Sequence, residues 1–171
     1  AAHLSGCSVV ATAPSRQQVL DWLAEVPDPE IPVLSITDLG IVRDVDCESG
    51  VVVSLSPTYS GCPATEVIES SVVAALEDQG VADVSIKRVL SPPWTTDWIS
   101  DIGREKLRRY GIAPPEKGAS KRALLQGNLA VPCPRCDSGK TEQISEFGST
   151  ACKASYRCTD CLEPFEYFKC L

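Results

Sequence analysis

Apolar residues between positions 15 and 112 recur with two different periods. A spacing of three or four residues predicts an amphipathic helix, and strict alternation predicts a half-buried strand. The predicted elements, in chain order, are a helix capped by Ser15, strands over roughly 41–47 and 51–56, a helix around 67–76 that closes at Gly80, a strand over about 82–89 and a helix over about 97–110. This α-β-β-α-β-α order predicts an α+β domain with helices on one face of a small three-stranded sheet.

A change of composition follows this domain. Residues 113–128 are rich in Pro, Gly, Ser and charge and have no sustained period, which is typical of a linker. We therefore expect a flexible tail over 1–14, the α+β domain over 15–112, the linker, and a separate module over 129–171. A module of about 43 residues rarely folds on its hydrophobic core alone and needs a cross-link or a metal.

Two C-x-x-C pairs can supply that metal site. Cys133–Cys136 and Cys158–Cys161 are separated by 21 residues, and each pair can hold one metal ion from a tight turn. Four thiolates with no spare ligand describe a closed, structural zinc site, so the sequence predicts a C-terminal zinc ribbon. A redox-active dithiol and an iron site with the same four sulfurs are the alternatives.

Composition and charge narrow the function classes. The chain is 43% hydrophobic and 23% charged, which fits a globular protein rather than a disordered one. Its apolar runs are far too short for a membrane span. Residues 1–98 carry four basic and 14 acidic groups, which disfavours nucleic acid as a partner. The first 14 residues lack the basic segment of a signal peptide, so we expect a reducing, cytoplasmic compartment.

Cys62 is the first candidate for chemistry outside the metal site. It lies in Ser60-Gly61-Cys62-Pro63, where the loop after the second strand leads into a predicted helix. Proline fits the first helical position, so Cys62 is the expected N-cap. Unpaired backbone N–H groups and the helix dipole favour a thiolate there. The spacing alone leaves two interpretations open: a reactive thiol, or a small residue that only caps the helix.

An acidic turn is the second candidate. Asp28 and Glu30 lie in the proline-rich segment PDPEIPV, and Asp38 follows in Asp-Leu-Gly. Such carboxylates could bind a metal or orient the Cys62 thiol, but acidic residues in turns more often cap backbone N–H groups. From the residues alone, capping is the favoured interpretation.

The remaining cysteines and the single histidine give weaker signals. Cys152 and Cys170 belong to the C-terminal module, and burial as small apolar residues near the metal is favoured over ligation. Cys7 and Cys47 are expected to be incidental. His3 lies in the N-terminal tail, so no histidine-based catalytic triad is expected.

Several segments resemble known families. The sequence DPEIPVLSITDLGIV followed by TYSGCPA is similar to the small cytosolic iron–sulfur assembly factors that include SufT-like proteins. SPPWTTDWISDIGREKLRRYGIAPP, CPRC, SEFGSTACKASYRC and CLEPFEYFKC closely resemble the PaaD (PaaJ) family of the bacterial phenylacetyl-CoA oxygenase, or epoxidase, system. The resemblance covers about 15–171, nearly the whole chain.

The resemblance implies a part in aerobic phenylacetate degradation. That system has an oxygenase with a diiron subunit and a reductase with an iron–sulfur cluster and flavin, and PaaD-like proteins are thought to mature or maintain one of these centres. The family's reactive cysteine matches Cys62, its acidic motif matches Asp28 to Glu30, and Asp38 lies close behind. The zinc-ribbon ligands match Cys133, Cys136, Cys158 and Cys161.

The sequence supports an accessory role rather than catalysis by this chain. It has no Glu and Glu-x-x-His set for a diiron centre and no Gly-rich dinucleotide fingerprint. No base is visible beside Cys62, which disfavours a thiol-dependent enzyme.

Two hypotheses follow, and they differ in class. In the first, the Cys62 thiolate transiently binds iron or a cluster, with its symmetry mate if the chain forms a homodimer, and passes it to the oxygenase or reductase. In the second, the chain is a scaffold that docks these two partners through the zinc ribbon and a basic helix. The basic residues of that helix are Arg104, Lys106, Arg108 and Arg109.

Overall fold

Helix α1 (Arg16–Leu23) begins at the predicted cap in the computed structural model, which describes residues 13–59, 61–118 and 131–169. Ser15 Oγ accepts a hydrogen bond from the Gln18 N–H (3.3 Å), and Gln18 Oε1 accepts one from the Ser15 N–H (2.9 Å). This reciprocal capping box satisfies two backbone donors at the start of the helix. Val19 and Leu23 are buried on its inner face.

The first sheet has the predicted three strands. β1 (Val42–Asp46) and β2 (Val51–Leu55) form an antiparallel hairpin. β3 (Val84–Arg88) then pairs parallel with β2, which requires a crossover. Helix α2 (Thr65–Asp78) provides that crossover. The predicted order of elements is therefore confirmed, and the strand order is β1-β2-β3.

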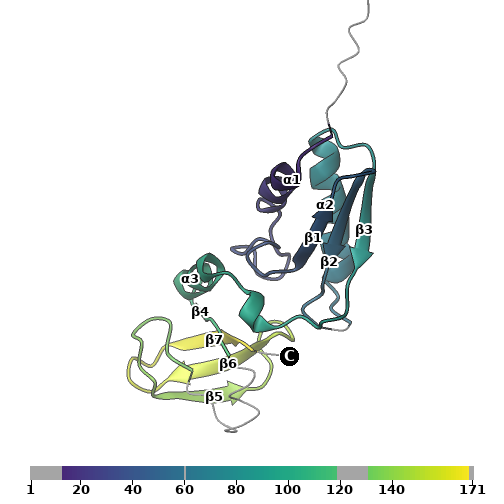
Figure 1. The fold of residues 1–171 in the computed structure, drawn as a ribbon. Coiled ribbons are helices and arrows are strands. Elements are labelled where there is room, and N and C mark those ends of the chain that lie inside the picture. Colours follow the sequence, from purple (N-terminus) through teal and green to yellow (C-terminus); the bar gives the residue numbers. More distant parts are fainter. Residues whose placement is uncertain (1–12, 60, 119–130, 170–171) are drawn as a thin grey trace, which may run out of the picture.

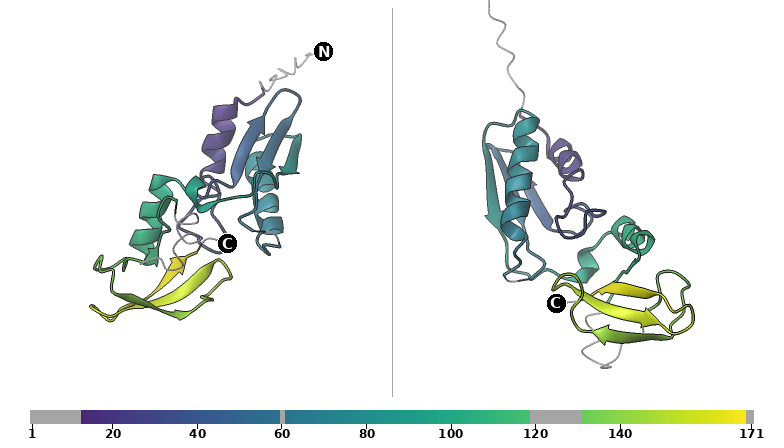
Figure 2. Two further views of the ribbon diagram at one scale, coloured as in Figure 1. Left: turned by 60° about the horizontal axis from the view of Figure 1, so that its bottom comes forward. Right: turned by 180° about the vertical axis from the view of Figure 1, so that it is seen from behind.

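Helices α1 and α2 contact each other and cover one face of this sheet (Figure 2). The central strand β2 buries alternate residues against them, as a half-buried strand should. Helix α2 buries residues at helical spacing on the facing side. The buried residues of these two elements are Val51, Val53, Leu55, Ile68, Val72 and Leu76.

Helix α3 (Asp101–Tyr110) departs from the expected arrangement. It follows the short 3-10 helix η1 (Thr96–Trp98) and lies beside the C-terminal module rather than on the sheet (Figure 1). The expectation that every helix covers one face of the sheet is therefore wrong for α3. Only Gly103 and Leu107 are buried along it, so its apolar stripe is too narrow to cover a sheet. Gly111 ends the helix with φ 92°.

The C-terminal module, called the ribbon here, contains β5 (Thr141–Ser145), β6 (Lys153–Cys158) and β7 (Pro164–Phe168). These strands pair antiparallel, and β4 (Ile112–Ala113) adds a parallel edge to β7. The expected boundary between the first domain and the linker thus falls inside a strand of the ribbon sheet. Most of the expected tail and linker lies outside the described residues.

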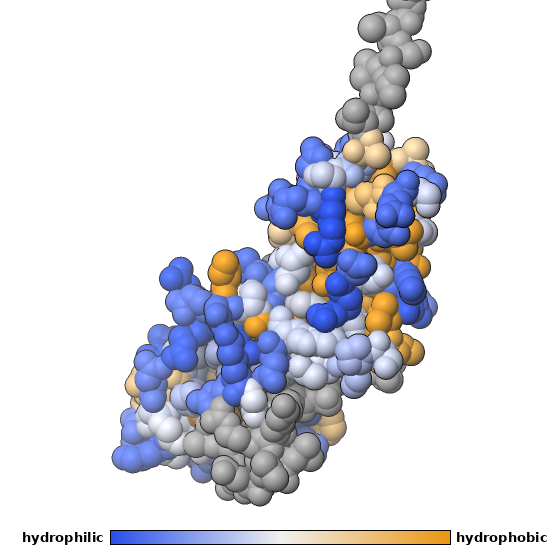
Figure 3. Space-filling view, in the orientation of Figure 1, coloured by the Kyte–Doolittle hydropathy of each residue, from blue (hydrophilic) through white to orange (hydrophobic). Residues whose placement is uncertain are grey.

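The first domain and the ribbon share part of their core. Trp94 donates its indole N–H to the Leu39 carbonyl (2.8 Å) and meets Phe168 of β7 edge-to-face, with ring centroids 6.2 Å apart. Ile112, Cys152 and Phe168 all belong to the core cluster of the first domain. On the face drawn in Figure 3, mostly hydrophilic side chains cover α3, and apolar and polar side chains are mixed over the three-stranded sheet. The first domain and the ribbon are therefore joined by a buried apolar contact.

Candidate functional site

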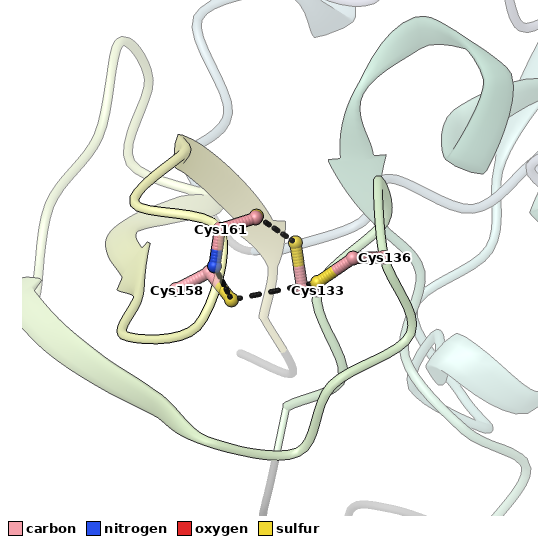
Figure 4. A group of neighbouring side chains, drawn as sticks. All are labelled: Cys133, Cys136, Cys158 and Cys161. Atoms are coloured by element: carbon pink, nitrogen blue, oxygen red, sulfur yellow. Dashed lines mark hydrogen bonds between the residues drawn. The ribbon is translucent and has the colours of Figure 1, made fainter.

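The four ribbon cysteines converge on one point (Figure 4). The Sγ atoms of Cys133 and Cys161 lie 3.7 Å apart, and those of Cys136 and Cys158 lie 3.6 Å apart. All four sulfurs lie within 4.8 Å of one another. A tetrahedral metal with bonds of about 2.3 Å places its sulfur ligands about 3.8 Å apart. The four side chains therefore fit a closed, four-thiolate metal centre.

A backbone N–H group of the second C-x-x-C turn, Cys158–Cys161, supports this centre. The Cys161 N–H donates to Cys158 Sγ (3.5 Å). This hydrogen bond favours the thiolate and is the main cause that lowers the pKa of Cys158 to about 7. Cys133 and Cys158 are fully buried, whereas Cys136 and Cys161 are exposed. The centre therefore lies at one edge of the ribbon. The four sulfurs leave no coordination position free on a tetrahedral metal.

Cys62 lies in the turn that precedes α2. Its carbonyl accepts a hydrogen bond from the Thr65 N–H (3.2 Å), and its own N–H donates to the Tyr59 carbonyl (3.3 Å). The expectation that Cys62 is the helix N-cap is wrong: α2 begins at Thr65, and Ala64 occupies the cap position without a side-chain hydrogen bond. An additional turn over Pro63 and Ala64 separates the thiol from the helical N–H groups.

A small cavity, partly open to the surface, brings Cys62 together with the acidic turn. Its lining includes Asp28, Glu30, Cys62, Cys152 and Phe168. Its volume is about 20 Å³, which is room for roughly one water molecule or one ion. Cys62 is half-buried and also lines a depression on the outer surface. The Cys62 side chain therefore lies between the cavity and the surface.

Asp28 holds the acidic turn in shape. Its Oδ1 accepts hydrogen bonds from the N–H groups of Glu30 (2.9 Å) and Ile31 (2.8 Å). Burial raises the pKa of the Asp28 carboxyl, and these two N–H groups oppose that shift. Asp28 thus has the capping role expected of acidic turn residues, and it fixes the backbone that carries Glu30.

Asp38 lies outside the cavity lining. Its carboxylate accepts hydrogen bonds from the Ser35 N–H (3.2 Å) and the Ser100 hydroxyl (3.1 Å), and it pairs with Lys106 (2.6 Å). The structure therefore brings Asp28 and Glu30 to Cys62, while Asp38 binds the start and middle of α3.

Cys152 is the site residue that sequence reasoning did not place here. It precedes β6 in the ribbon, but its side chain is 5% exposed and packs into the core of the first domain. Its Sγ lies 3.5 Å from Glu30 Oε2, 122 residues away in the chain. Only the packing of the two lobes produces this contact, so no local sequence signal could have revealed it.

The other cysteines do not join this site. Cys47 is half-buried just after β1, and burial raises the pKa of its thiol. It lines a different surface depression, beside Trp22 and Gly80. Cys7, Cys170 and His3 lie outside the described residues.

Comparison with known proteins divides the chain in the same way. Residues 16–87 match the model of the iron–sulfur cluster assembly protein family, and residues 117–169 match the PaaD zinc beta ribbon domain. A solved domain of unknown function (DUF59) from Bacillus anthracis is 29% identical, has a TM-score of 0.50, and aligns with 54% of this chain and 90% of its own. Fold and site thus define a protein with an iron–sulfur cluster assembly domain followed by a zinc ribbon.

Two relatives identify the family. A protein from Escherichia coli (strain K12) that is named as a subunit of 1,2-phenylacetyl-CoA epoxidase is 52% identical over 92% of this chain and 94% of its own length. The Fe-S protein maturation auxiliary factor YitW from Bacillus subtilis (strain 168) is 38% identical over 56% of this chain and 87% of its own length. The chain belongs to the PaaD family of the phenylacetyl-CoA epoxidase system.

The described residues contain no helix that is both long enough and apolar enough to cross a membrane.

Proposed function

We propose that this chain is an accessory protein of a phenylacetyl-CoA epoxidase system and matures or maintains an iron or iron–sulfur centre of the oxygenase or the reductase. Two comparisons support this: a relative named as an epoxidase subunit aligns over nearly the whole chain, and a maturation factor aligns with the first domain. In this proposal Cys62 is the thiol that holds the metal during transfer, and Glu30 assists it.

The observation that carries the proposal is the position of Cys62. The thiol lines a small cavity beside a carboxylate and also lines an outer depression bounded by Gly61, Glu66 and Leu90. A transfer thiol needs both features: an enclosed place that shields the metal, and a surface from which a second protein's ligands can take it. Ligand exchange between thiolates also requires that Cys62 not be permanently bound elsewhere, and Cys62 is in no disulfide.

We further propose that the four ribbon cysteines hold zinc. Their sulfur spacing suits a structural ion rather than a catalytic one, because four thiolates fill the coordination sphere of a tetrahedral metal. A bound zinc would supply folding free energy on the order of 10 kcal/mol to a small module. The ribbon would then hold Cys152 and Phe168 against the cavity.

The scaffold hypothesis has less support. It assigns docking to the zinc ribbon and the basic residues of α3, but several of these basic residues bind within the chain. Arg104 donates to the carbonyls of Pro115 and Thr96, Lys106 pairs with Asp38, and Arg108 pairs with Asp137. Among the four, Arg109 has only an exposed pair with Glu105 in its own helix. Most of the positive charge is therefore used to fix α3 in place.

The proposal is tested by replacing Cys62 in cells that depend on this chain for epoxidase activity. We expect Cys62→Ser to abolish phenylacetyl-CoA turnover while the soluble level of the chain is unchanged. Cys47→Ser is the matched control, because Cys47 is another free, half-buried cysteine of the same domain. Normal turnover with Cys62→Ser would overturn the proposal.

A further inference from the structure

The ribbon forms part of the wall of the Cys62 cavity. Cys152 and Phe168 of the ribbon line it together with Glu30 and Cys62 of the first domain. The ribbon has a core cluster of its own, around Cys133 and Cys158, and Cys152 is not part of that cluster. Cys152 is therefore placed where it packs against the first domain and not where it could serve the four-cysteine centre.

Three metal-ligating side chains face this small space. The Cys152 thiol lies 3.5 Å from Glu30 Oε2, and Glu30 is fixed by the turn that Asp28 caps. The Cys62 side chain lines the same cavity, so the two thiols and the carboxylate border one small space.

The nearby cations are already paired. Lys153 binds Glu166 (3.3 Å), and Arg88, at the cavity wall, binds Glu69 with two nitrogens. Both basic groups are thus bound by other carboxylates. A divalent cation that binds between two thiols and a carboxylate releases the two thiol protons to solvent.

This inference rests on the proposed function and specifies its cargo. We propose that Cys62, Cys152 and Glu30 form a transient site for a single ferrous ion, with Cys152 as its second thiolate ligand. Two sulfur donors and one oxygen donor suit a borderline divalent metal. The cavity of about 20 Å³ has room for one ion.

The distances between ligand atoms distinguish this transient site from a permanently occupied metal site. Within residues 13–59, 61–118 and 131–169, only the four ribbon cysteines bring three or more ligand atoms within 4.8 Å of one another. The Cys62 turn must therefore move toward Cys152 and Glu30 to complete the coordination. A site that closes only around its ion binds it more weakly than a preorganised one, which suits delivery to another protein.

The test titrates the full chain with its ribbon loaded with zinc. Cobalt(II) is added under anaerobic conditions, and thiolate-to-cobalt charge-transfer absorption reports the number of thiolate ligands. We expect one cobalt(II) per chain beyond the zinc. Cys152→Ala and Cys62→Ala should each remove about half of that absorption and weaken binding at least tenfold. Cys47→Ala should match the wild type.

A second measurement does not depend on a buried substitution that could disturb folding. X-ray absorption at the iron edge of the wild-type chain, loaded with one ferrous ion beside its ribbon zinc, counts the sulfur ligands. Two sulfurs support the proposal. One sulfur, or full cobalt affinity in a folded Cys152→Ala chain, overturns it.

Failure of this inference is distinguishable from failure of the proposed function. If Cys152→Ala leaves metal binding unchanged but Cys62→Ser still abolishes epoxidase activity, Cys152 is not a ligand and the maturation role stands. If both cysteines bind the ion but Cys62→Ser leaves the epoxidase active, the metal site exists and the maturation role is wrong.

Discussion

Lys106 of α3 lies 2.6 Å from Asp38 (Nζ to Oδ2), and this ion pair joins α3 to the loop that borders the Cys62 cavity. The Ser100 N–H at the start of α3 donates to the Asp38 carbonyl (2.8 Å), and the Ser100 hydroxyl donates to its carboxylate. The next residue, Leu39, lines the cavity. Asp38 therefore positions one wall of the cavity without lining it.

This network predicts a pH-dependent contribution to stability. Burial acts to raise the pKa of Asp38, but Lys106 and the Ser35 N–H outweigh it and hold the pKa below its usual value of 3.8. A depressed folded-state pKa stabilises the protein above about pH 4, and this contribution is lost as the pH falls through the folded-state pKa. We expect Asp38→Asn to lower the free energy of unfolding by about 2 kcal/mol at pH 7. Urea unfolding should show the difference from wild type shrinking below pH 4; a constant difference would contradict it.

Gly40 is predicted to be intolerant of a side chain. Its φ is 68°, and an added Cβ would lie 2.5 Å from the Trp98 carbonyl oxygen. Gly40→Ala should therefore cost about 3 kcal/mol of unfolding free energy, from backbone strain and the clash together. Gly80→Ala is the matched control: its φ of 85° is similar, but nothing lies within 4 Å, so about 1 kcal/mol is expected. Equal costs in thermal or urea unfolding would show that the Trp98 contact has no effect.

Removal of the ribbon metal is predicted to expose Cys152. In the folded chain this side chain is 5% exposed. Loss of the metal unfolds the ribbon, because such a module has too little core of its own. Mass spectrometry after thiol alkylation should find Cys152 protected before chelation and modified afterwards, whereas Cys47 should react equally in both states. Continued protection of Cys152 would mean that the ribbon holds its position without metal.

Charge reversal at Arg109 separates the maturation and scaffold hypotheses. Arg109 is exposed, and its pair with Glu105 within one helix is worth only about 0.3–0.5 kcal/mol. Arg109→Glu should therefore lower the unfolding free energy by less than about 1 kcal/mol and leave epoxidase turnover in cells unchanged. Lost turnover with normal stability would favour docking through α3.

Local features of the fold were predictable from the sequence, and contacts between the lobes were not. The Ser15 cap and the ligand pair within each C-x-x-C turn depend on residues three apart in the chain, so their patterns suffice. The contact between Cys152 and Glu30 depends on how the ribbon packs against the first domain. Similarly, the position of α3 depends on Lys106 reaching Asp38 across 68 residues.

The Cys62 turn shows a subtler limit. Cys62 followed by Pro63 has the composition of a helix start, but the hydrogen bond from the Thr65 N–H to the Cys62 carbonyl forms a separate turn first. Composition identifies the region in which a helix begins, and the backbone hydrogen bonds decide the residue. The error matters here, because it moves the expected source of thiol chemistry from the helix dipole to the cavity.

The most direct test of the account is the iron content of the client proteins. The oxygenase and the reductase would be purified from cells that contain equal soluble levels of the wild-type chain or its Cys62→Ser variant, with Cys47→Ser as control. We predict that Cys62→Ser leaves one of the two proteins iron-poor and that the control leaves both fully loaded. Normal iron in both proteins with Cys62→Ser would contradict delivery through Cys62.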